Sequence, residues 1–337
     1  MKILVTGGAG FIGSNFIHYL LDRHPDYDVV NLDKLTYAGN LENLQSVSGN
    51  SHYSFIKGDI ADADLVRGIM DRGMDAIINF AAESHVDRSI LEPASFIRTN
   101  VLGTQVLLDV ARERHLPRFV QISTDEVYGS LGPTGRFTED TCLCPNSPYS
   151  ASKASADMIA LAYHRTFDLP VLVTRTSNNY GPYQFPEKLL PLVITNLMED
   201  RQVPLYGDGM NVRDWIFVKD NAEAIDLVLH KGKEGEVYNI GAGCESTNLS
   251  LIQGVLDVMK KPDSLITYVK DRPGHDRRYA IDPSKIRNIL GWSPRTMLQD
   301  GLRKTIDWYT KNTDWWKRIK SGEYLKYYEK NYTPKGL

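Results

Sequence analysis

The sequence predicts an α/β protein built on a doubly wound parallel sheet, with a smaller C-terminal substrate-binding lobe. Over residues 1–180, short apolar runs alternate with helical patterns. The runs are rich in Ile and Val and carry few polar residues, as strands buried on both faces do. A glycine-rich loop joins the first run to the first helical pattern. Regular alternation of strands and helices is typical of parallel sheets with helices on both faces.

Six strands and four helices are expected in residues 1–180. The predicted strands cover residues 2–6, 28–33, 53–57, 76–81, 119–123 and 170–176. The helical patterns between them lie near 13–24, 62–72, 93–115 and 147–167. We therefore assign residues 1–180 to a single domain that contains the sheet.

The composition changes after residue 180, where the strand–helix alternation weakens. Pro182, Pro186, Pro191 and Pro204 interrupt the chain, and proline is disfavoured in helix interiors and central strands. A strand at 236–240 and a helix at 249–259 are expected beyond them. Residues 214–229 have the pattern of one more strand and helix, so part of 210–245 is expected to rejoin the sheet. Residues 181–337 should otherwise form the smaller lobe.

The composition excludes several classes of function. The net charge of −3 over 337 residues gives no global basic field for nucleic acid or acidic membranes. Three cysteines, Cys142, Cys144 and Cys244, do not make a disulfide framework, and neither they nor the histidines have the spacing of a metal site. The apolar runs are shorter than the roughly 18 residues of a membrane helix, and the N-terminus lacks a signal-peptide layout. We therefore expect a cytoplasmic protein without metal.

The glycine-rich loop predicts a dinucleotide site. Gly7, Gly10 and Gly13 follow the first strand and open the first helix. Glycines there permit a tight turn and close approach of the backbone to a pyrophosphate, which the helix N-terminus attracts. Asp33 ends the second strand, where a carboxylate accepts from a ribose 2′-hydroxyl and repels a 2′-phosphate. This favours NAD over NADP, although the neighbouring Lys34 weakens the argument.

Two further segments are expected beside the cofactor, after the third and fourth strands. Asp59 follows the third strand and could reach the adenine, or it could serve as a helix N-cap or turn residue. Residues 81–84 follow the fourth strand and would face the middle of the cofactor. Both placements use the rule that open parallel sheets bind ligands outside the carboxyl ends of their strands.

A tyrosine and a lysine four residues apart begin a predicted helix. Ser147 is suited to its N-cap and Pro148 to its first position, so Tyr149 and Lys153 share one helix face. An ammonium near a phenol stabilises the phenolate and lowers the phenol pKa. Tyr149 is therefore suited to accept a proton from a sugar hydroxyl as hydride leaves. Such a pair is common on helices, and the dinucleotide loop upstream is what favours a catalytic role.

Two neighbouring carboxyl groups follow the fifth strand. They are Asp125 and Glu126, directly after Thr124. A carboxylic acid and a carboxylate beside a newly formed ketone can expel water, provided that burial or mutual repulsion separates their pKa values. A solvated acidic pair is the alternative. The tyrosine and lysine favour the chemical role.

Seven motifs together point to a known family. They are Thr-Gly-Gly-Ala-Gly-Phe-Ile-Gly (6–13), Ala-Ala-Glu-Ser-His-Val-Asp-Arg-Ser (81–89), Ser-Thr-Asp-Glu-Val-Tyr-Gly (123–129), Tyr-Ser-Ala-Ser-Lys (149–153), Asn-Asn-Tyr-Gly-Pro (178–182), Pro-Leu-Tyr-Gly-Asp-Gly (204–209) and Asp-Arg-Pro-Gly-His-Asp (271–276). Over nearly its whole length the chain resembles the extended short-chain dehydrogenase/reductases, and more closely the nucleotide-sugar 4,6-dehydratases. The Thr-Asp-Glu triplet is the feature specific to the dehydratases. The resemblance implies a Rossmann-like fold and tightly bound NAD.

The resemblance implies a role for each residue of the reactive set. Tyr149, assisted by Lys153, takes the proton of the C4 hydroxyl while hydride passes from C4 to NAD, and Thr124 helps to hold that hydroxyl. Glu126 then removes the C5 proton. Asp125 protonates the departing C6 hydroxyl, which leaves as water. Hydride returns to C6, which gives a 4-keto-6-deoxy sugar and leaves NAD unchanged.

Two sets of binding residues complete the expectation. Around the cofactor we expect Gly7, Gly10, Phe11, Ile12, Gly13, Asp33, Lys34, Asp59, Ile60, Ala81, Ala82, Ser84, Thr99, Tyr149, Lys153 and Asn178. Around the nucleotide sugar the resemblance implies Ser84, His85, Thr124, Asn178, Lys188, Leu189, Pro204, Tyr206, Arg213, Asn248, Arg272 and His275. The residues alone leave other roles open: core packing for Tyr206, a structural hydrogen bond for His85, and a solvated surface charge for either arginine.

The substrate that the resemblance implies is dTDP-glucose, and UDP-glucose or another nucleotide hexose is an alternative. A 4-epimerase of the same fold is a rival, since it shares Tyr149 and Lys153 but needs no acid–base pair beside Thr124. A dinucleotide-binding sensor without chemistry is a second rival, and the presence of both Tyr149 and Lys153 argues against it. The resemblance further implies a homodimer whose helices near 93–115 and 147–167 form a four-helix bundle.

Overall fold

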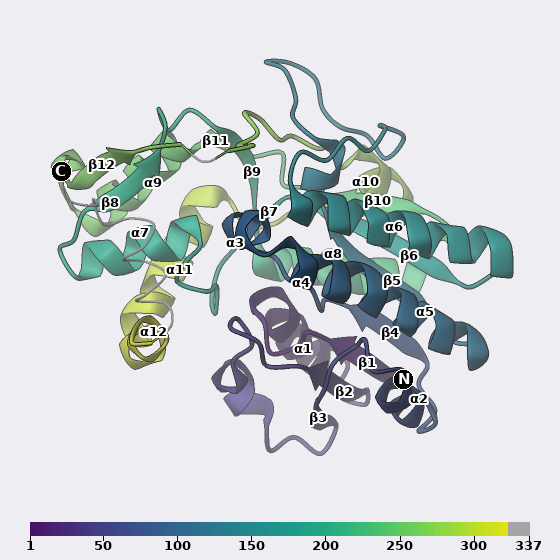
Figure 1. Cartoon of the computed structure of the whole chain (residues 1–337). Helices are drawn as coiled ribbons and strands as arrows, with labels where there is room; N and C mark the ends of the chain where they lie inside the picture. Colours follow the sequence, from purple (N-terminus) through teal and green to yellow (C-terminus); the bar gives the residue numbers. More distant parts are fainter. Residues whose placement is uncertain (272, 323–337) are drawn as a thin grey trace.

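The computed structural model describes residues 1–271 and 273–322, and its centre is a seven-stranded parallel sheet (Figure 1). The strand order is β10-β6-β5-β4-β1-β2-β3. The order reverses between β1 and β4, so the sheet is doubly wound as predicted. The strands are β1 (Lys2–Thr6), β2 (Asp28–Asp33), β3 (Tyr53–Lys57), β4 (Ala76–Asn79), β5 (Phe119–Thr124), β6 (Val171–Thr176) and β10 (Val237–Ile240).

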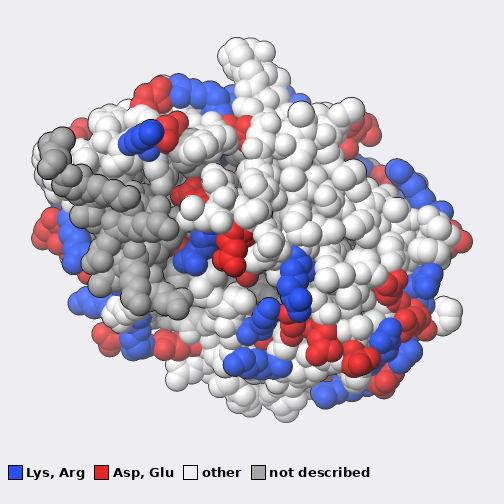
Figure 2. Space-filling model, viewed as in Figure 1, with Lys and Arg blue, Asp and Glu red and all other residues white. Residues whose placement is uncertain are grey.

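Helices cover both faces of this sheet because its strands are apolar on both sides. Alternate residues of a strand point to opposite faces, so Ile3 and Val5 enter one core and Leu4 enters the other. The first core lies under α1 (Phe11–Arg23), α8 (Val218–Lys231) and α10 (Ser284–Leu290). The second lies under α2 (Ala63–Met70), α5 (Thr104–Glu113) and α6 (Pro148–Phe167). On the face viewed in Figure 2, the surface over α6 carries few charged side chains.

The predicted helix near 93–115 is confirmed over residues 93–113, with a π-helical segment that the prediction did not include. The segment consists of α4 (Pro93–Phe96), a π-helical segment η2 (Ile97–Gly103) and then α5. Hydrogen bonds in a π-segment run from residue i to i+5, which the apolar spacing of the sequence does not reveal. The segment has a role in the site, because Thr99 lines the central cavity. Asn100 binds the 81–84 loop: its Nδ2 donates to Glu83 O at 3.0 Å.

Two strand ends also differ from the prediction, since β4 ends at Asn79 and β5 continues to Thr124. A buried polar group explains the first difference. Asn79 Oδ1 accepts from Thr6 Oγ1 at 2.6 Å, and Asn79 Nδ2 donates to Gln121 Oε1 at 2.8 Å. These side chains join β1, β4 and β5 at their carboxyl ends. Residues 81–84 therefore lie in a loop and not in the strand.

The C-terminal part adds a lobe with its own apolar core beside the carboxyl edge of the sheet (Figure 1). Two small sheets belong to it: β11-β9-β7, and β12 with β8. Its elements are β7 (Asn178–Tyr180), α7 (Leu189–Met198), β8 (Val203–Tyr206), β9 (Val212–Phe217), β11 (Glu245–Thr247), α9 (Asn248–Met259), η4 (Asp263–Leu265), β12 (Ile266–Val269), α11 (Leu298–Lys311) and α12 (Thr313–Lys320). Short segments η1 (Leu41–Val47), α3 (Val86–Leu91) and η3 (Asp125–Tyr128) lie in the first 180 residues.

The segment expected to rejoin the sheet does so only in part. β10 pairs in parallel with β6 at the sheet edge, and α8 packs on α1. The strand expected near 214, β9, instead pairs with β7 and β11. The β6 edge is already occupied by β10, so β9 lies in the small sheet at the base of the lobe. The domain boundary at residue 180 stays a prediction.

Candidate active site

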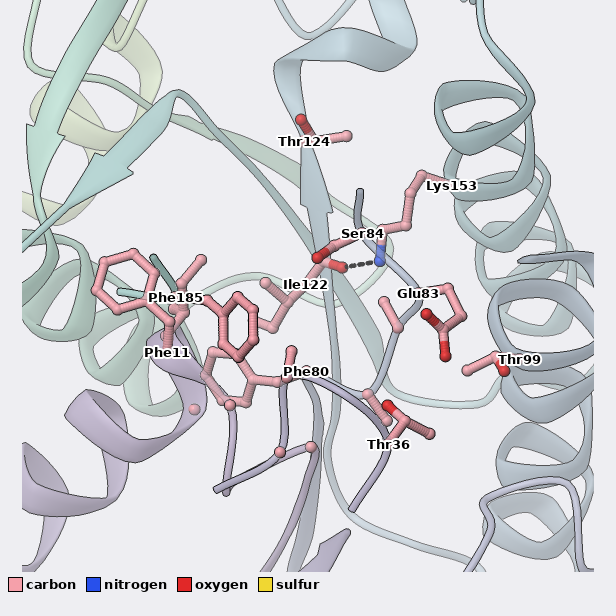
Figure 3. A pocket seen from close by; sticks show the side chains of 18 of the residues that line it. Phe11, Thr36, Phe80, Glu83, Ser84, Thr99, Ile122, Thr124, Lys153 and Phe185 are labelled. Carbon is pink, nitrogen blue, oxygen red and sulfur yellow. Dashed lines mark hydrogen bonds between the residues drawn. The ribbon is translucent and has the colours of Figure 1, made fainter. Parts of the chain in front are cut away.

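A cavity of about 300 Å³ opens where the strand order reverses. This is the position at which open α/β sheets bind ligands. In Figure 3 the aromatic side chains Phe11, Phe80 and Phe185 gather at one side of it, and Lys153 and Glu83 lie at the other. All of the residues predicted to bind the cofactor line this cavity.

The glycine loop leaves no room for a Cβ atom at Gly7 or Gly13. Gly7 has φ +68°, and a Cβ there would lie 2.6 Å from the Ala81 nitrogen. A Cβ on Gly13 would lie 2.4 Å from the Gly7 oxygen. The loop ends at Gly10, the N-cap of α1, where no side chain caps the first N–H groups of the helix. Such a helix start suits a pyrophosphate, so the residues present fit a dinucleotide.

The carboxylate of Asp33 ties the glycine loop to the end of β2. Its Oδ2 accepts from Ala9 N at 2.9 Å and its Oδ1 from Leu35 N at 2.8 Å. Burial raises the pKa of Asp33, and these two hydrogen bonds lower it. A carboxylate has about four acceptor sites, so it can also accept from a ribose hydroxyl. Lys34 forms an ion pair with Asp59 at 2.9 Å, which weakens the objection that Lys34 attracts a 2′-phosphate.

The structure brings the five predicted catalytic residues to this cavity. Thr124 ends β5 and begins η3, where its Oγ1 accepts from Glu126 N at 3.3 Å and donates to Asp125 Oδ1 at 3.3 Å. Tyr149 and Lys153 lie on the first turns of α6. Lys153 Nζ donates to Ile122 O at 2.6 Å, the dashed contact in Figure 3.

Asp125 has the environment of a protonated acid. Its side chain is 2% exposed, and its Oδ2 has no hydrogen-bond partner within the described residues. Burial raises the pKa of Asp125 well above its usual range, the Glu126 carboxylate raises it further, and Arg213 opposes the shift. Two adjacent carboxyls that differ in burial can hold opposite protonation states.

The expected direction of the Tyr149 shift is wrong for this structure. Burial, followed by the Glu126 carboxylate, raises the pKa of Tyr149. A hydrogen bond with Thr124 opposes this rise in the Tyr149 pKa. Burial lowers the pKa of Lys153 itself to about 8, and its Nζ donates to the Ile122 carbonyl oxygen. The i, i+4 spacing predicts that Tyr149 and Lys153 share one helix face. It does not predict that both groups are desolvated.

The predicted nucleotide-sugar residues divide into two groups. Thr124, Ser84, Asn178 and Lys188 line the cavity, and Lys188 Nζ donates to Ser84 O at 3.1 Å. Seven others lie outside its lining among the described residues: His85, Leu189, Pro204, Tyr206, Arg213, Asn248 and His275. Arg272 lies outside the described residues. The roles of all these residues stay predictions.

Several of the outlying residues are held by the protein itself. Arg213 is 5% exposed, its Nη2 donates to Asp276 O at 2.9 Å, and its guanidinium lies 4.2 Å from the Tyr279 ring centroid. The alternative of a solvated surface charge is therefore wrong for Arg213. Tyr206 donates from its hydroxyl to Asp87 Oδ2 at 3.3 Å. Asn248 is 8% exposed, and its Oδ1 is buried without a partner among the described residues.

Further residues line the cavity that the sequence did not indicate. They include Thr36, Tyr37, Phe80, Thr176, Gln184, Phe185 and Glu187. Glu187 is 4% exposed and accepts from Arg88 Nη2 at 3.2 Å. Tyr37 and Phe80 follow β2 and β4, so the rule about strand ends could have found them. The segment 184–187 follows a proline-rich turn and has no periodic pattern.

One group of metal-ligating side chains lies together within the described part of the chain: His24, Asp226 and His230. His24 Nε2 lies 3.0 Å from Asp226 Oδ1, and His230 Nε2 lies 3.0 Å from the Tyr27 hydroxyl. Hydrogen bonds between the turn after α1 and α8 account for this arrangement, and none of these residues lines the cavity. Within residues 1–271 and 273–322, every helix is too short or too polar to span a bilayer.

The chain is similar in sequence and in structure to several known proteins. The model of the GDP-mannose 4,6 dehydratase family matches residues 4–305. A dTDP-glucose 4,6-dehydratase of Xanthomonas campestris is 52% identical over 95% of this chain and 96% of its own length. A Bacillus anthracis dTDP-glucose 4,6-dehydratase crystallised with NAD superposes with a TM-score of 0.90 at 53% identity, covering 95% of this chain and 99% of that one. The Streptomyces venezuelae enzyme of the same name, with NAD and TYD bound, gives 0.92 at 51% identity, covering 95% and 100%.

Proposed function

The chain belongs to the GDP-mannose 4,6 dehydratase family, and from this premise we propose that it is an NAD-dependent dTDP-glucose 4,6-dehydratase. It is a lyase that converts dTDP-glucose into dTDP-4-keto-6-deoxy-glucose with net loss of one water. Relatives of this name match the chain over nearly its full length. The resemblance to the nucleotide-sugar 4,6-dehydratases that the motifs implied is confirmed, and so is NAD as the cofactor.

NAD, when bound in the glycine loop, accepts a hydride from the sugar C4 and later returns it to C6. The chain's own residues handle the protons. Tyr149 accepts the proton of the C4 hydroxyl, which Thr124 orients, and Lys153 supplies positive charge beside it. The ketone formed at C4 acidifies the C5 proton.

Two carboxyl groups then remove water across C5 and C6. Glu126 takes the C5 proton as a carboxylate. Asp125, which burial holds in its protonated form, donates its proton to the departing C6 hydroxyl. A proton returns to C5 when the hydride reaches C6, so the balance is the loss of one water and no net oxidation.

The observation that carries this proposal is the carboxyl pair beside Tyr149 and Lys153 in one cavity. A 4-epimerase needs only the tyrosine, the lysine and NAD. The buried acid Asp125 and the neighbouring carboxylate have no task in that reaction. A sensor without chemistry would need none of these groups.

Incubation of the holoenzyme with dTDP-glucose and, separately, UDP-glucose tests the function. We expect a 4-keto-6-deoxy product from dTDP-glucose, seen by its absorbance in alkali and identified by mass and NMR. A galacto-configured product would identify an epimerase instead. Faster turnover of UDP-glucose would contradict the proposed base preference.

We also propose a cytoplasmic homodimer. Support for the dimer comes from apolar side chains exposed along α3, η2 and α6: Leu91, Ile97, Leu102, Met158 and Phe167 are each more than 40% exposed. η2 and α6 lie in the two helices, near 93–115 and 147–167, that the sequence assigned to a four-helix bundle, and Figure 2 shows few charges over α6. Support for the cytoplasm comes from Cys142, Cys144 and Cys244, which are all free thiols, as is usual in a reducing compartment.

A further inference from the structure

A buried acidic residue, Asp157, extends the helix face that carries Tyr149 and Lys153. The three residues are spaced four apart on α6, so they follow one another along one face. Their exposed fractions are 8% for Tyr149, 4% for Lys153 and 0% for Asp157. Aspartate is almost never fully buried unless it is paired.

Arg175 on β6 is the partner that holds this carboxylate. Arg175 Nε donates to Asp157 Oδ2 at 2.9 Å, and the two side chains are 4% and 0% exposed. Arg175 Nη1 donates to the Tyr128 hydroxyl at 2.9 Å, and that hydroxyl donates to Asn239 Oδ1 at 2.8 Å. The guanidinium therefore links α6, β6, η3 and β10, and these rigid elements fix the position of the carboxylate.

The second carboxyl oxygen of Asp157, Oδ1, differs from Oδ2 in its surroundings. Oδ1 is buried and is not used by the link to Arg175, and the Ser123 hydroxyl acts on this carboxylate and lowers its pKa. Lys153 lies one helical turn before it. Burial lowers the pKa of Lys153 to about 8, and Asp157 is the one charged group among the described residues that raises it.

The other charged or titratable groups around this pair come from the neighbouring elements. Burial raises the pKa of Asp157, while Arg175 from β6, Lys153 and the Ser123 hydroxyl oppose that shift. From η3, Glu126 and Asp125 act on Tyr149, whose pKa they raise, and Asp157 adds to the same shift. None of these groups balances the desolvation of Lys153. Without Asp157, no charged group among the described residues would oppose the lowering of the Lys153 pKa by burial.

We propose that Asp157 is a positioning residue, because the carboxylate fixed by Arg175 holds Lys153 in its cationic form beside Tyr149. The inference rests on the proposed function, in which the lysine charge supports Tyr149 as the base. A structural role alone would not require this pair, since buried ion pairs can often be replaced by apolar groups without loss of stability.

The test is the pH profile of C4 oxidation in Asp157→Asn, measured as single-turnover NADH absorbance with the holoenzyme and dTDP-glucose. Asparagine keeps the shape and removes the charge, so Lys153 should lose its proton at lower pH. We expect the basic limb of the profile to move down by about one pH unit, with a roughly tenfold loss on that limb and less than about threefold at the acidic end. Asp157→Glu restores the charge and should return the basic limb toward that of the parent.

Two further variants separate this role from folding. Asp157→Asn with Arg175→Met removes both buried charges, so no unpaired guanidinium remains, and it should show the same shift. Asp220→Asn is the matched control, since Asp220 is 6% exposed and accepts from Thr296 N at 2.8 Å but does not line the cavity. Its profile should match that of the parent.

Three results would overturn the proposal. They are an unshifted basic limb in the folded Asp157→Asn and double variants, a uniform loss at every pH in both, or the same shift in Asp220→Asn. Failure of the proposed function has a different signature, because the parent holoenzyme itself would then give no keto product from dTDP-glucose.

Discussion

At the scale of single residues, burial distinguishes the two carboxyls that we propose as acid and base. Asp125 and Glu126 are adjacent and chemically similar, and sequence position does not distinguish them. The pKa of Asp125 is raised well above its usual range because its side chain is desolvated and faces the Glu126 carboxylate. The higher pKa of Asp125 suits it to the role of the acid and leaves the role of the base to Glu126 in the proposed reaction.

Asp125→Asn and Glu126→Gln should slow the loss of water while C4 oxidation survives. Each variant removes one partner of the elimination and leaves Thr124, Tyr149 and Lys153 in place. We expect NADH to form and persist in a single turnover, with keto-product formation slowed by about 10²–10⁴-fold, the usual size of general acid–base contributions. Equal loss of the NADH signal in both variants would show that the carboxyls also act in the oxidation.

Gly13→Ala should abolish retention of NAD. The new Cβ would lie 2.4 Å from the Gly7 oxygen, a backbone atom that cannot yield, so the pyrophosphate loop must shift. Gly68→Ala is the control, because no atom lies within 4 Å of its Cβ position on α2, and alanine favours a helix by roughly 0.5–1 kcal/mol over glycine. The NAD content of the purified proteins, measured by absorbance after denaturation, checks both. Full occupancy in Gly13→Ala would contradict the tight packing of the loop.

At the scale of elements, the start of α6 sets the position of Tyr149, the proposed base. Ser147 caps the helix, since its Oγ accepts from Ser150 N at 3.1 Å and Ser150 Oγ accepts from Ser147 N at 3.0 Å. This reciprocal pair is a capping box. Because Tyr149 lies two residues beyond the cap, fraying of the first turn would move its phenol directly.

Ser147→Ala should therefore reduce both stability and activity. Loss of an N-cap hydroxyl costs about 1 kcal/mol of unfolding free energy, which urea unfolding can measure. Ser155→Ala is the control on the same helix, because its Oγ bonds only the Ala151 carbonyl at 2.9 Å, and it should change stability by less than about 0.5 kcal/mol. A stability loss in Ser155→Ala as large as in Ser147→Ala would show that the cap is not the cause.

At the scale of the whole molecule, the fold separates two tasks. The sheet carries the glycine loop, the acid–base groups and the lysine at its carboxyl edge, and the lobe adds Lys188 and Asn178 to the same cavity. The surface over α6 and η2 exposes apolar side chains. Three residues of these two elements, Thr99, Tyr149 and Lys153, line the cavity. This surface is the subunit interface that we propose.

Met158→Lys should weaken the proposed dimer. Met158 is 55% exposed on α6, and an unpaired ammonium buried at an interface costs several kcal/mol. Sedimentation equilibrium at micromolar concentration should show monomer in this variant. Met297→Lys changes a residue that is 74% exposed at the start of α11 and should leave the mass unchanged. A parent that sediments as a monomer would remove the proposal.

The sequence by itself determined the doubly wound sheet, the glycine loop, Asp33 and the five residues proposed as catalytic, which the structure brings to one cavity. These follow from local rules: apolar runs mark strands that are buried on both faces, glycine marks backbone that must approach closely, and a fixed spacing places two side chains on one helix face. Each rule relates residues that are near one another in the chain.

Only the tertiary structure decided the directions of the pKa shifts and the more distant neighbours. The pKa of Tyr149 rises where the i, i+4 spacing predicted a fall, because desolvation depends on everything that packs around the site. The pairing of Asp157 with Arg175, the return of β10 to the sheet without β9, and Glu187 in the cavity wall join residues far apart in sequence. Electrostatics and packing act through space, so a pattern along the chain does not contain them.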